Sequence, residues 1–318
     1  MSQNRYCIGV DLGGTNIAVG LVRLDTKSIV RQFRVKTNAP RTCESISGDI
    51  AEVSQKLCNQ EGIRLSDVAW IGIATPGIVK DDVVLLAYNL GWTNVELGKV
   101  LSKITSRPTF VANDANAAAY AEAIWGSGAG SKSLVAFTLG TGVGGGIVID
   151  GKIWEGVNGF AAEMGHTVLV PGGRVCTCGK RGCIEAYCSV TALVKETKRM
   201  MELYPESIMW KLVEGDLSRV NGKTAFIADA EGDKCASLII GEFIDVLSTG
   251  IENVINIFQP DVVCIGGGIS REGENLISKL RERVRHATFG ADGLRTKLVA
   301  ANFRNEAGII GAALLGLR

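Results

Sequence analysis

The chain contains 318 residues, in which 34 Lys and Arg nearly balance 33 Asp and Glu and leave a net charge of +1. This balance excludes charge-driven nucleic-acid binding as the main activity, because contacts to phosphates need a clear basic excess. Hydrophobic residues make up 46% of the chain. That content excludes a disordered chain and supplies cores for about two domains of ordinary size.

Apolar runs of strand length recur along the chain, and helical patterns lie between them. The predicted strands cover residues 6–10, 17–24, 68–74, 109–112, 134–139, 146–149 and 262–265, and the predicted helices cover residues 45–60, 95–104, 115–125, 186–204 and 239–258. Strands and helices mixed in this way, with glycine-rich turns, predict an α/β fold.

Glycine is the unusual feature of the composition: the chain has 40, whereas average usage of about 7% would give about 22. Only six prolines accompany them, and the glycines have no three-residue period, so collagen-like and low-complexity chains are excluded. The excess predicts tight turns and places where backbone approaches a ligand. Glycines also interrupt the uncharged stretch 133–149, which is therefore predicted as two strands around a loop and not as a membrane span.

The nine cysteines are an odd number and are mostly scattered singly. Such a pattern is typical of reduced thiols in a cytoplasm and not of a disulfide framework. The first residues show no apolar leader segment. We therefore expect a cytoplasmic protein without a membrane partner.

Two segments with an offset of 127 residues resemble each other. Residues 10–15 and 137–142 are both strand ends that enter a glycine turn and return into another apolar strand. They predict a duplicated hairpin, one copy in each of two closely packed domains, with a ligand held between them. Chance similarity of two glycine turns is the alternative.

The second of these turns, residues 140–145, satisfies the pattern GxGxxG. In a dinucleotide-binding fold a helix must follow this pattern, but here a β-branched strand follows it, so we reject that interpretation. No GxxxxGK[ST] pattern is present either. The remaining interpretation is a hairpin in which turn amides and a threonine hydroxyl hold phosphate oxygens. The candidate phosphate-binding residues are Gly140, Thr141, Gly142 and Gly144.

The first turn adds a carboxylate at the end of its strand. Its candidate residues are Asp11, Gly13, Gly14, Thr15 and Asn16. An aspartate beside phosphate-holding amides suits Mg²⁺, which binds through carboxylates and retained waters. The alternative is an ordinary turn in which Asp11 caps its own backbone. The triple glycine Gly266, Gly267 and Gly268 favours the ligand-binding interpretation.

Three cysteines lie within eight residues, at positions 176, 178 and 183, and glycines between them permit tight turns. His166 lies ten residues upstream and completes a Cys₃His set, the donor set of a structural zinc site. Cys176, Cys178, Cys183 and His166 are therefore the candidate zinc ligands, with one Zn²⁺ expected per chain. A redox pair is the alternative.

The order of motifs along the chain resembles the ROK family of sugar kinases and related repressors. The motifs are DxGGTxxxxG at 11–20, NDANAAA at 113–119, LGTGVGGG at 139–146, AExGH at 162–166, CxCGxxGCxE at 176–185 and IGGGI at 265–269. The resemblance covers essentially the whole chain. It implies the two-domain actin-like, ribonuclease-H-like ATPase fold with a central cleft.

The resemblance also implies roles for single residues. Asp114 would be the base that accepts the proton of a sugar hydroxyl, although by position it can equally cap the helix that follows it. Asn89, Asn113, Glu163, His166 and Glu185 would contact the sugar, whereas by themselves the two glutamates could be surface acids. Adenine would bind near Gly266–Gly268. One departure is Ala162, which stands where the family usually has glycine, so the shape of the pocket is open.

These patterns lead to a definite expectation. Residues 1–114 with 305–318 would form the first domain, and residues 115–304, with the zinc-binding loop 166–185, would form the second. The resemblance implies an ATP-dependent kinase acting on the 6-hydroxyl of glucose, since Asn89-Leu90-Gly91-Trp92 resembles the glucokinase branch. N-acetylmannosamine or N-acetylglucosamine is the alternative substrate, and fructose or allose is less favoured. A non-catalytic sugar-binding regulator is a further alternative, and the resemblance suggests a homodimer or homotetramer.

Overall fold

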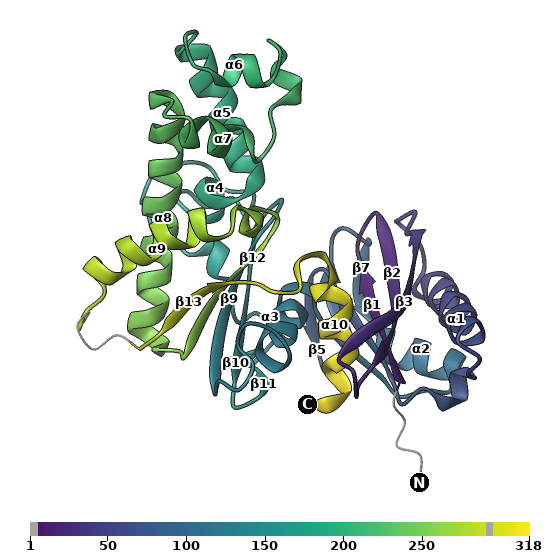
Figure 1. Ribbon diagram of the computed structural model, residues 1–318. Coiled ribbons are helices and arrows are strands. Elements are labelled where there is room, and N and C mark those ends of the chain that lie inside the picture. The colour runs from purple at the N-terminus through teal and green to yellow at the C-terminus, as the bar shows by residue number, and fades with distance from the viewer. Residues whose placement is uncertain (1–5, 291–294) are drawn as a thin grey trace. The chain divides into compact units, whose positions relative to one another are not determined.

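The computed structural model describes residues 6–290 and 295–318, and the chain divides into two compact units (Figure 1). The first unit comprises Met1–Ser133, Gly146–Ala162 and Asn305–Arg318, and the second comprises Leu134–Gly145 and Glu163–Arg304. The C-terminal segment, from Asn305, lies in the first unit. The predicted boundary after residue 114 differs from this division, because residues 115–133 and 146–162 also belong to the first unit.

The first unit is built on a five-stranded sheet with the order β3-β2-β1-β4-β8. Strands β1, β2 and β3 pair in antiparallel fashion, whereas β4 pairs in parallel with β1 and with β8. The strands are β1 (Tyr6–Leu12), β2 (Asn16–Arg23), β3 (Ser28–Lys36), β4 (Ile71–Thr75) and β8 (Thr109–Asn113). Of these, only β3 was not predicted, because its alternating pattern is rich in polar residues.

Helices cover the two faces of this sheet (Figure 1). Alternate residues of β1 point to opposite faces, so Ile8 and Val10 pack in the core with Ile46 of α1, while Cys7 packs with Ile309 of α10. The face of the sheet that packs against α1 also buries residues of α2. The helices of this unit are α1 (Cys43–Gln60), α2 (Leu97–Thr105), α3 (Asp114–Ile124) and α10 (Ala307–Leu314).

Helix α10 lies directly against the backbone of β1 on one side and of α3 on another. A Cβ on Gly9 would lie 1.9 Å from the carbonyl oxygen of Ile309, and a Cβ on Gly311 would lie 1.9 Å from that of Ala117 in α3. Only glycine permits such close approach. This contact packs the alanine-rich α3 closely against α10 within the first unit.

The second sheet has the order β11-β10-β9-β12-β13, and β12 pairs in parallel with both β9 and β13. Its strands are β9 (Ser133–Leu139), β10 (Val143–Ile149), β11 (Lys152–Ile153), β12 (Val262–Gly267) and β13 (Lys297–Ala300). Each sheet therefore runs from a meander of three strands into two parallel strands. This common order supports the internal duplication that the two glycine turns predicted.

The remaining elements complete the two units. A three-stranded sheet in the first unit consists of β5 (Ile78–Lys80), β6 (Val83–Ala87) and β7 (Trp92–Val95). The helices of the second unit are α4 (Glu185–Cys188), α5 (Val190–Leu203), α6 (Met209–Leu212), α7 (Thr224–Ala230), α8 (Lys234–Phe258) and α9 (Glu274–Ala287). In the described part of the chain, none of the helices has the length and apolar character needed to cross a membrane.

The prediction of one helix over residues 186–204 is wrong in one respect: the segment forms two helices, α4 and α5. Ser189 has extended backbone, with φ −75° and ψ 156°, and its hydroxyl accepts the N–H of Ala192 at 3.1 Å. Ser189 is thus the N-cap of α5 and separates it from α4, as serine at a helix start commonly does.

Candidate active site and metal cluster

The carboxyl ends of three parallel strands bring polar residues to one edge of the first sheet. The register pairs Asp11 of β1 with Ala74 of β4, and Thr75 of β4 with Asn113 of β8. Asp114 follows directly as the first residue of α3. Ligands of open α/β sheets bind at this edge, and the structure brings together there the candidates Asp11, Asn113 and Asp114.

Asp11 is a carboxylate in a largely apolar setting. Burial raises its pKa above the ordinary value of 3.8, and the cation of Arg34 opposes this effect. Arg34 pairs with Ala18, which in turn pairs with Asp11, so the three side chains share one face of the sheet. A bound cation would favour the charged form of Asp11, and a carboxylate is a ligand that Mg²⁺ prefers.

The first glycine turn, which joins β1 to β2, is held by contacts close to it. The N–H of Gly13 donates to the carbonyl of Asn16 at 2.9 Å, and the hydroxyl of Thr37 donates to the carbonyl of Gly13 at 2.6 Å. Thr15 and Asn16 are exposed at the tip. A Cβ on Gly14 would lie 3.1 Å from Cβ of Asn89, so Asn89, a predicted sugar contact, lies beside this turn.

Asn113 and Asp114 occupy the start of α3. The side-chain oxygen of Asn113 accepts the N–H groups of Ala115 and Asn116 at 2.9 and 3.1 Å, and its amide donates to the carbonyl of Gly77 at 2.9 Å. Asn113 is therefore the N-cap of the helix, and one of these contacts uses its side-chain amide. Asp114 is exposed, and its Oδ1 accepts the N–H of Ala115 at 2.8 Å.

The second glycine turn joins β9 to β10, as predicted in place of a dinucleotide-binding helix. The N–H of Gly140 donates to the carbonyl of Gly142 at 3.0 Å, and, unlike the first turn, this turn is also held by residues from far along the chain. The N–H of Val190 donates to the carbonyl of Gly140, and the hydroxyl of Thr191 donates to the carbonyl of Thr141, both at 2.8 Å. The N–H of Val143 donates to Oε2 of Glu185 at 3.0 Å.

The triple glycine lies next to this second turn. In the register of the parallel pair β9–β12, Gly266 is opposite Thr138 and Gly267 is opposite Leu139. Gly267 has φ +82°, and a Cβ there would lie 2.3 Å from the carbonyl oxygen of Leu139, so this position requires glycine. The structure thus brings Gly266–Gly268 beside the turn that carries Gly140, Thr141 and Gly142.

The segment that carries Glu163 and His166 also packs on β10. A Cβ on Gly165 would lie 2.0 Å from the carbonyl oxygen of Val143. Glu163 is exposed. Ala162 has φ +65°, a left-handed conformation that costs a residue with a Cβ roughly 1–2 kcal/mol. This conformation explains why glycine would be preferred at position 162.

The four candidate metal ligands form one cluster, with all their donor atoms within 4.8 Å of one another. Sγ of Cys178 lies 3.7 Å from Sγ of Cys183, and Sγ of Cys176 lies 3.6 Å from Nδ1 of His166. A tetrahedral Zn²⁺ with bonds of about 2.3 Å to sulfur and about 2.05 Å to nitrogen requires separations of about 3.8 and 3.6 Å. The donor set and its spacing therefore fit zinc.

A redox pair fits the same cluster less well. All nine cysteines are free thiols, and the histidine nitrogen lies among the three sulfurs. Burial raises the pKa of Cys183, whereas the N–H of Lys180 lowers the pKa of Cys178. Charging three neighbouring thiols, one of them fully buried, is unfavourable unless a cation neutralises them.

Arg174, which the sequence analysis did not single out, anchors the loop that carries the candidate metal ligands. Arg174 forms ion pairs with Glu196 of α5 at 3.1 Å and with Glu242 of α8 at 2.7 Å. Its guanidinium also lies 4.5 Å from the ring centre of Tyr187, whose hydroxyl accepts the N–H of Arg174 at 3.0 Å. Such contacts join residues distant in sequence, so no local pattern predicts them.

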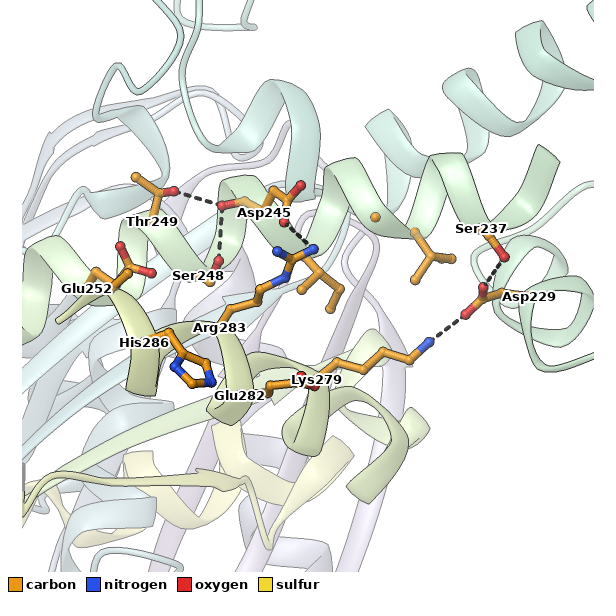
Figure 2. A pocket seen from close by; sticks show the side chains of 14 residues that line it. Asp229, Ser237, Asp245, Ser248, Thr249, Glu252, Lys279, Glu282, Arg283 and His286 are labelled. Carbon is orange, nitrogen blue, oxygen red and sulfur yellow. Dashed lines mark hydrogen bonds and ion pairs between the residues drawn. The ribbon is translucent and has the colours of Figure 1, made fainter. Parts of the chain in front are cut away.

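Figure 2 shows a groove of about 830 Å³ in the second unit, lined by residues of α7, α8 and α9. Lys279 is paired with Asp229 at 2.5 Å, and Arg283 is paired with Asp245 at 3.0 Å. The groove contains none of the predicted site residues. Both of these cations are therefore already paired with acids.

Known proteins resemble this chain over nearly its whole length. The model of the ROK family matches residues 7–318. A glucokinase of Thermotoga maritima is 38% identical over 309 residues, which are 96% of this chain and 95% of the relative. An N-acetylmannosamine kinase of Escherichia coli is 31% identical, with 98% of each chain covered.

Among solved structures, a ROK family glucokinase from Streptomyces griseus in complex with glucose and AMPPNP is 36% identical. The match covers 98% of each chain, with a TM-score of 0.80. A likeness of this extent shows the fold, which is the two-domain actin-like ATPase fold. The expectation drawn from the motif order is thereby confirmed.

Proposed function

This chain is a member of the ROK family, and from that membership and its own residues we propose that it transfers the γ-phosphoryl group of ATP to the 6-hydroxyl of glucose. The supporting observation is the full-length similarity to a solved structure that holds glucose and AMPPNP. The residues that this activity needs are all present at the matching motif positions. They are Asp114 as base, two glycine turns for phosphates, and polar side chains for the sugar.

In the proposed reaction the oxygen of the 6-hydroxyl attacks the γ-phosphorus. The new bond joins the sugar oxygen to phosphorus, the bond to the β-phosphate oxygen breaks, and ADP leaves. The carboxylate of Asp114 accepts the hydroxyl proton, and its exposure at the start of α3 suits contact with substrate. Phosphoryl transfer depends mostly on positioning and on charge stabilisation, which backbone N–H groups of the two turns would provide.

Two metal ions belong to this proposal. Mg²⁺ would be held by Asp11 and, when bound with ATP, would neutralise phosphate charge. Zn²⁺ would be held by His166, Cys176, Cys178 and Cys183 and would order the loop that carries Glu185. If Nδ1 of His166, which lies 3.6 Å from Sγ of Cys176, bound the metal, its ring proton would be on Nε2, which could then donate to a sugar hydroxyl.

Asn89, Asn113, Glu163, His166 and Glu185 are the proposed sugar contacts. Each carboxylate accepts hydrogen bonds from neighbouring hydroxyls with strong directionality. Glucose is favoured over N-acetylmannosamine by the higher identity to the glucokinase relative, 38% against 31%. We propose a cytoplasmic location, which the nine free cysteines support, and a homodimer or homotetramer as the assembly.

A substrate panel tests the proposal. ADP production is measured with Mg-ATP and glucose, N-acetylmannosamine, N-acetylglucosamine, fructose, allose or no sugar. We expect turnover with glucose well above that with every other sugar. Turnover mainly with an acetylated sugar would keep the mechanism and change the substrate. No turnover with any sugar, in folded protein that contains zinc, would favour a non-catalytic sugar-binding regulator.

A further inference from the structure

Glu185 contacts two structures that the sequence places far apart. Its Oε2 accepts the N–H of Val143, at the end of the second glycine turn, at 3.0 Å. Its Oε1 accepts the hydroxyl of Thr177 at 2.5 Å. Thr177 lies between two metal ligands, so one carboxylate joins the metal loop to the start of β10.

The space around this carboxylate is closely fitted. A Cβ on Gly142 would lie 2.4 Å from Oε2 of Glu185, so the carboxylate occupies the place that a side chain at position 142 would need. The chain then continues from Glu185 to Val190 and Thr191, which bind the carbonyls of Gly140 and Thr141. The same short segment therefore binds three consecutive peptide groups of the turn, through the carbonyls of Gly140 and Thr141 and the N–H of Val143.

These contacts also set the direction of the amides in the turn. In a planar trans peptide the C=O and the N–H point to opposite sides. When the carbonyls of Gly140 and Thr141 point to α5, the N–H groups of Thr141 and Gly142 point away from it. Those N–H groups are the ones that the proposed function assigns to phosphate.

From this geometry we infer that Glu185 and Thr177 are positioning residues that couple the metal loop to the nucleotide-binding turn. The inference rests on the proposed function for the identity of the ligand, which is a nucleoside phosphate. The coupling itself rests only on contacts within the second unit. Loss of the Thr177 hydroxyl should weaken nucleotide binding without removing the metal. Thr177 is neither one of the four candidate metal ligands nor one of the proposed phosphate-binding residues.

The test compares Thr177→Val, which removes the hydroxyl at nearly constant volume, with the matched control Thr177→Ser, which retains it. Zinc content is measured by elemental analysis, and the Kd for Mg-ADP is measured by calorimetry without sugar. We expect one zinc per chain in both variants. The Kd should rise about 3- to 10-fold in Thr177→Val, in line with the net contribution of one ordinary intramolecular hydrogen bond, and stay near the wild-type value in Thr177→Ser.

Amide hydrogen exchange decides the inference independently of nucleotide binding. In Thr177→Val the amide of Val143 should exchange faster, while the first glycine turn, residues 13–16, exchanges at the wild-type rate. Unchanged exchange at Val143 would overturn the coupling, whether or not that variant keeps its zinc. If the wild-type protein binds no ADP, the proposed function fails, and the exchange rates still test the coupling.

Discussion

The two glycine turns both begin with Leu-Gly at a strand end and lie in corresponding hairpins, but different parts of the chain hold them in place. The first turn is held by its own backbone and by Thr37, from the segment that follows β3. The second turn also has a backbone hydrogen bond of its own, from Gly140 to Gly142, but it is held in addition by Glu185, Val190 and Thr191, more than forty residues further along the chain. The second turn thus has contacts to a distant segment, the one that follows the candidate metal ligands, and the first turn has only contacts from nearby residues.

This difference shows that two hairpins of the same form can be stabilised by different contacts. A locally fixed turn keeps its geometry whenever its hairpin forms. A turn fixed by a distant segment can instead respond to whatever orders that segment, here Arg174 and any metal held by the four candidate ligands. Substitution of Asp114 tests the proposed catalytic base, and substitutions near each turn test how that turn is held.

The largest effect is expected at Asp114, which belongs to neither turn. Asp114→Asn should lower turnover about 10²- to 10⁴-fold, the usual range for loss of a general base, and leave the thermal unfolding midpoint unchanged, because the residue is exposed. Steady-state kinetics with Mg-ATP and glucose measures this effect. Asp150→Asn, an exposed substitution in the same unit, should retain wild-type turnover. Near-normal turnover of Asp114→Asn would remove Asp114 from the mechanism.

The next largest effect is expected from loss of the metal. Cys183 is fully buried, and Cys183→Ser should abolish zinc binding. The free energy of unfolding should then fall by at least about 4 kcal/mol, the contribution of a ligand present at a thousand times its Kd. Elemental analysis and denaturant unfolding measure both effects. Cys235→Ala in α8 should keep one zinc per chain, and a stable, zinc-loaded Cys183→Ser protein would exclude Cys183 as a ligand.

A pair of glycine substitutions compares the packing behind the two turns. Gly165→Ala brings a Cβ to 2.0 Å from the carbonyl oxygen of Val143, beside the second turn, and should cost about 1–3 kcal/mol of stability. Gly13→Ala, in the first turn, brings a Cβ to 3.2 Å from the carbonyl oxygen of Asn16 and should cost less than about 1 kcal/mol. Denaturant unfolding compares them. Equal losses would contradict the difference in packing.

The smallest effect concerns the pH dependence contributed by Asp11. Because burial raises its pKa above 3.8, the folded state binds more protons than the unfolded state between the two pKa values, and stability falls as pH rises through that window. Asp11→Asn should therefore unfold a few degrees higher than the wild type at neutral pH, and the gain should vanish below the unfolded pKa. A lower midpoint at neutral pH would show that the charged form is stabilised.

Much of this architecture could be predicted because its signals are local. A few neighbouring residues are enough to predict each of these features. They are the strand ends that enter glycine turns, the strand that follows GxGxxG in place of a helix, and the three closely spaced cysteines. The cluster of Cys176, Cys178, Cys183 and His166 was predicted in full for this reason, and the structure brings these residues together.

The features that the sequence did not reveal depend on tertiary contacts. Helix α3 joins the first unit because glycines of α10 admit its backbone, and Arg174 and Thr177 act through partners that only the fold brings near. Ser189 is an exception, because serine at a helix start is a local signal that could have divided the predicted helix. Strand β3 was missed since exposed polar residues alternate with its apolar ones.

The central claim is that phosphate passes from ATP to a sugar hydroxyl in this protein. Phosphorus-31 NMR of a reaction with Mg-ATP and glucose tests it most directly, because it distinguishes transfer from hydrolysis. The account predicts equal amounts of ADP and glucose 6-phosphate, with neither formed when sugar is omitted. Formation of ADP with inorganic phosphate alone, or no loss of ATP in the zinc-loaded protein, would contradict it.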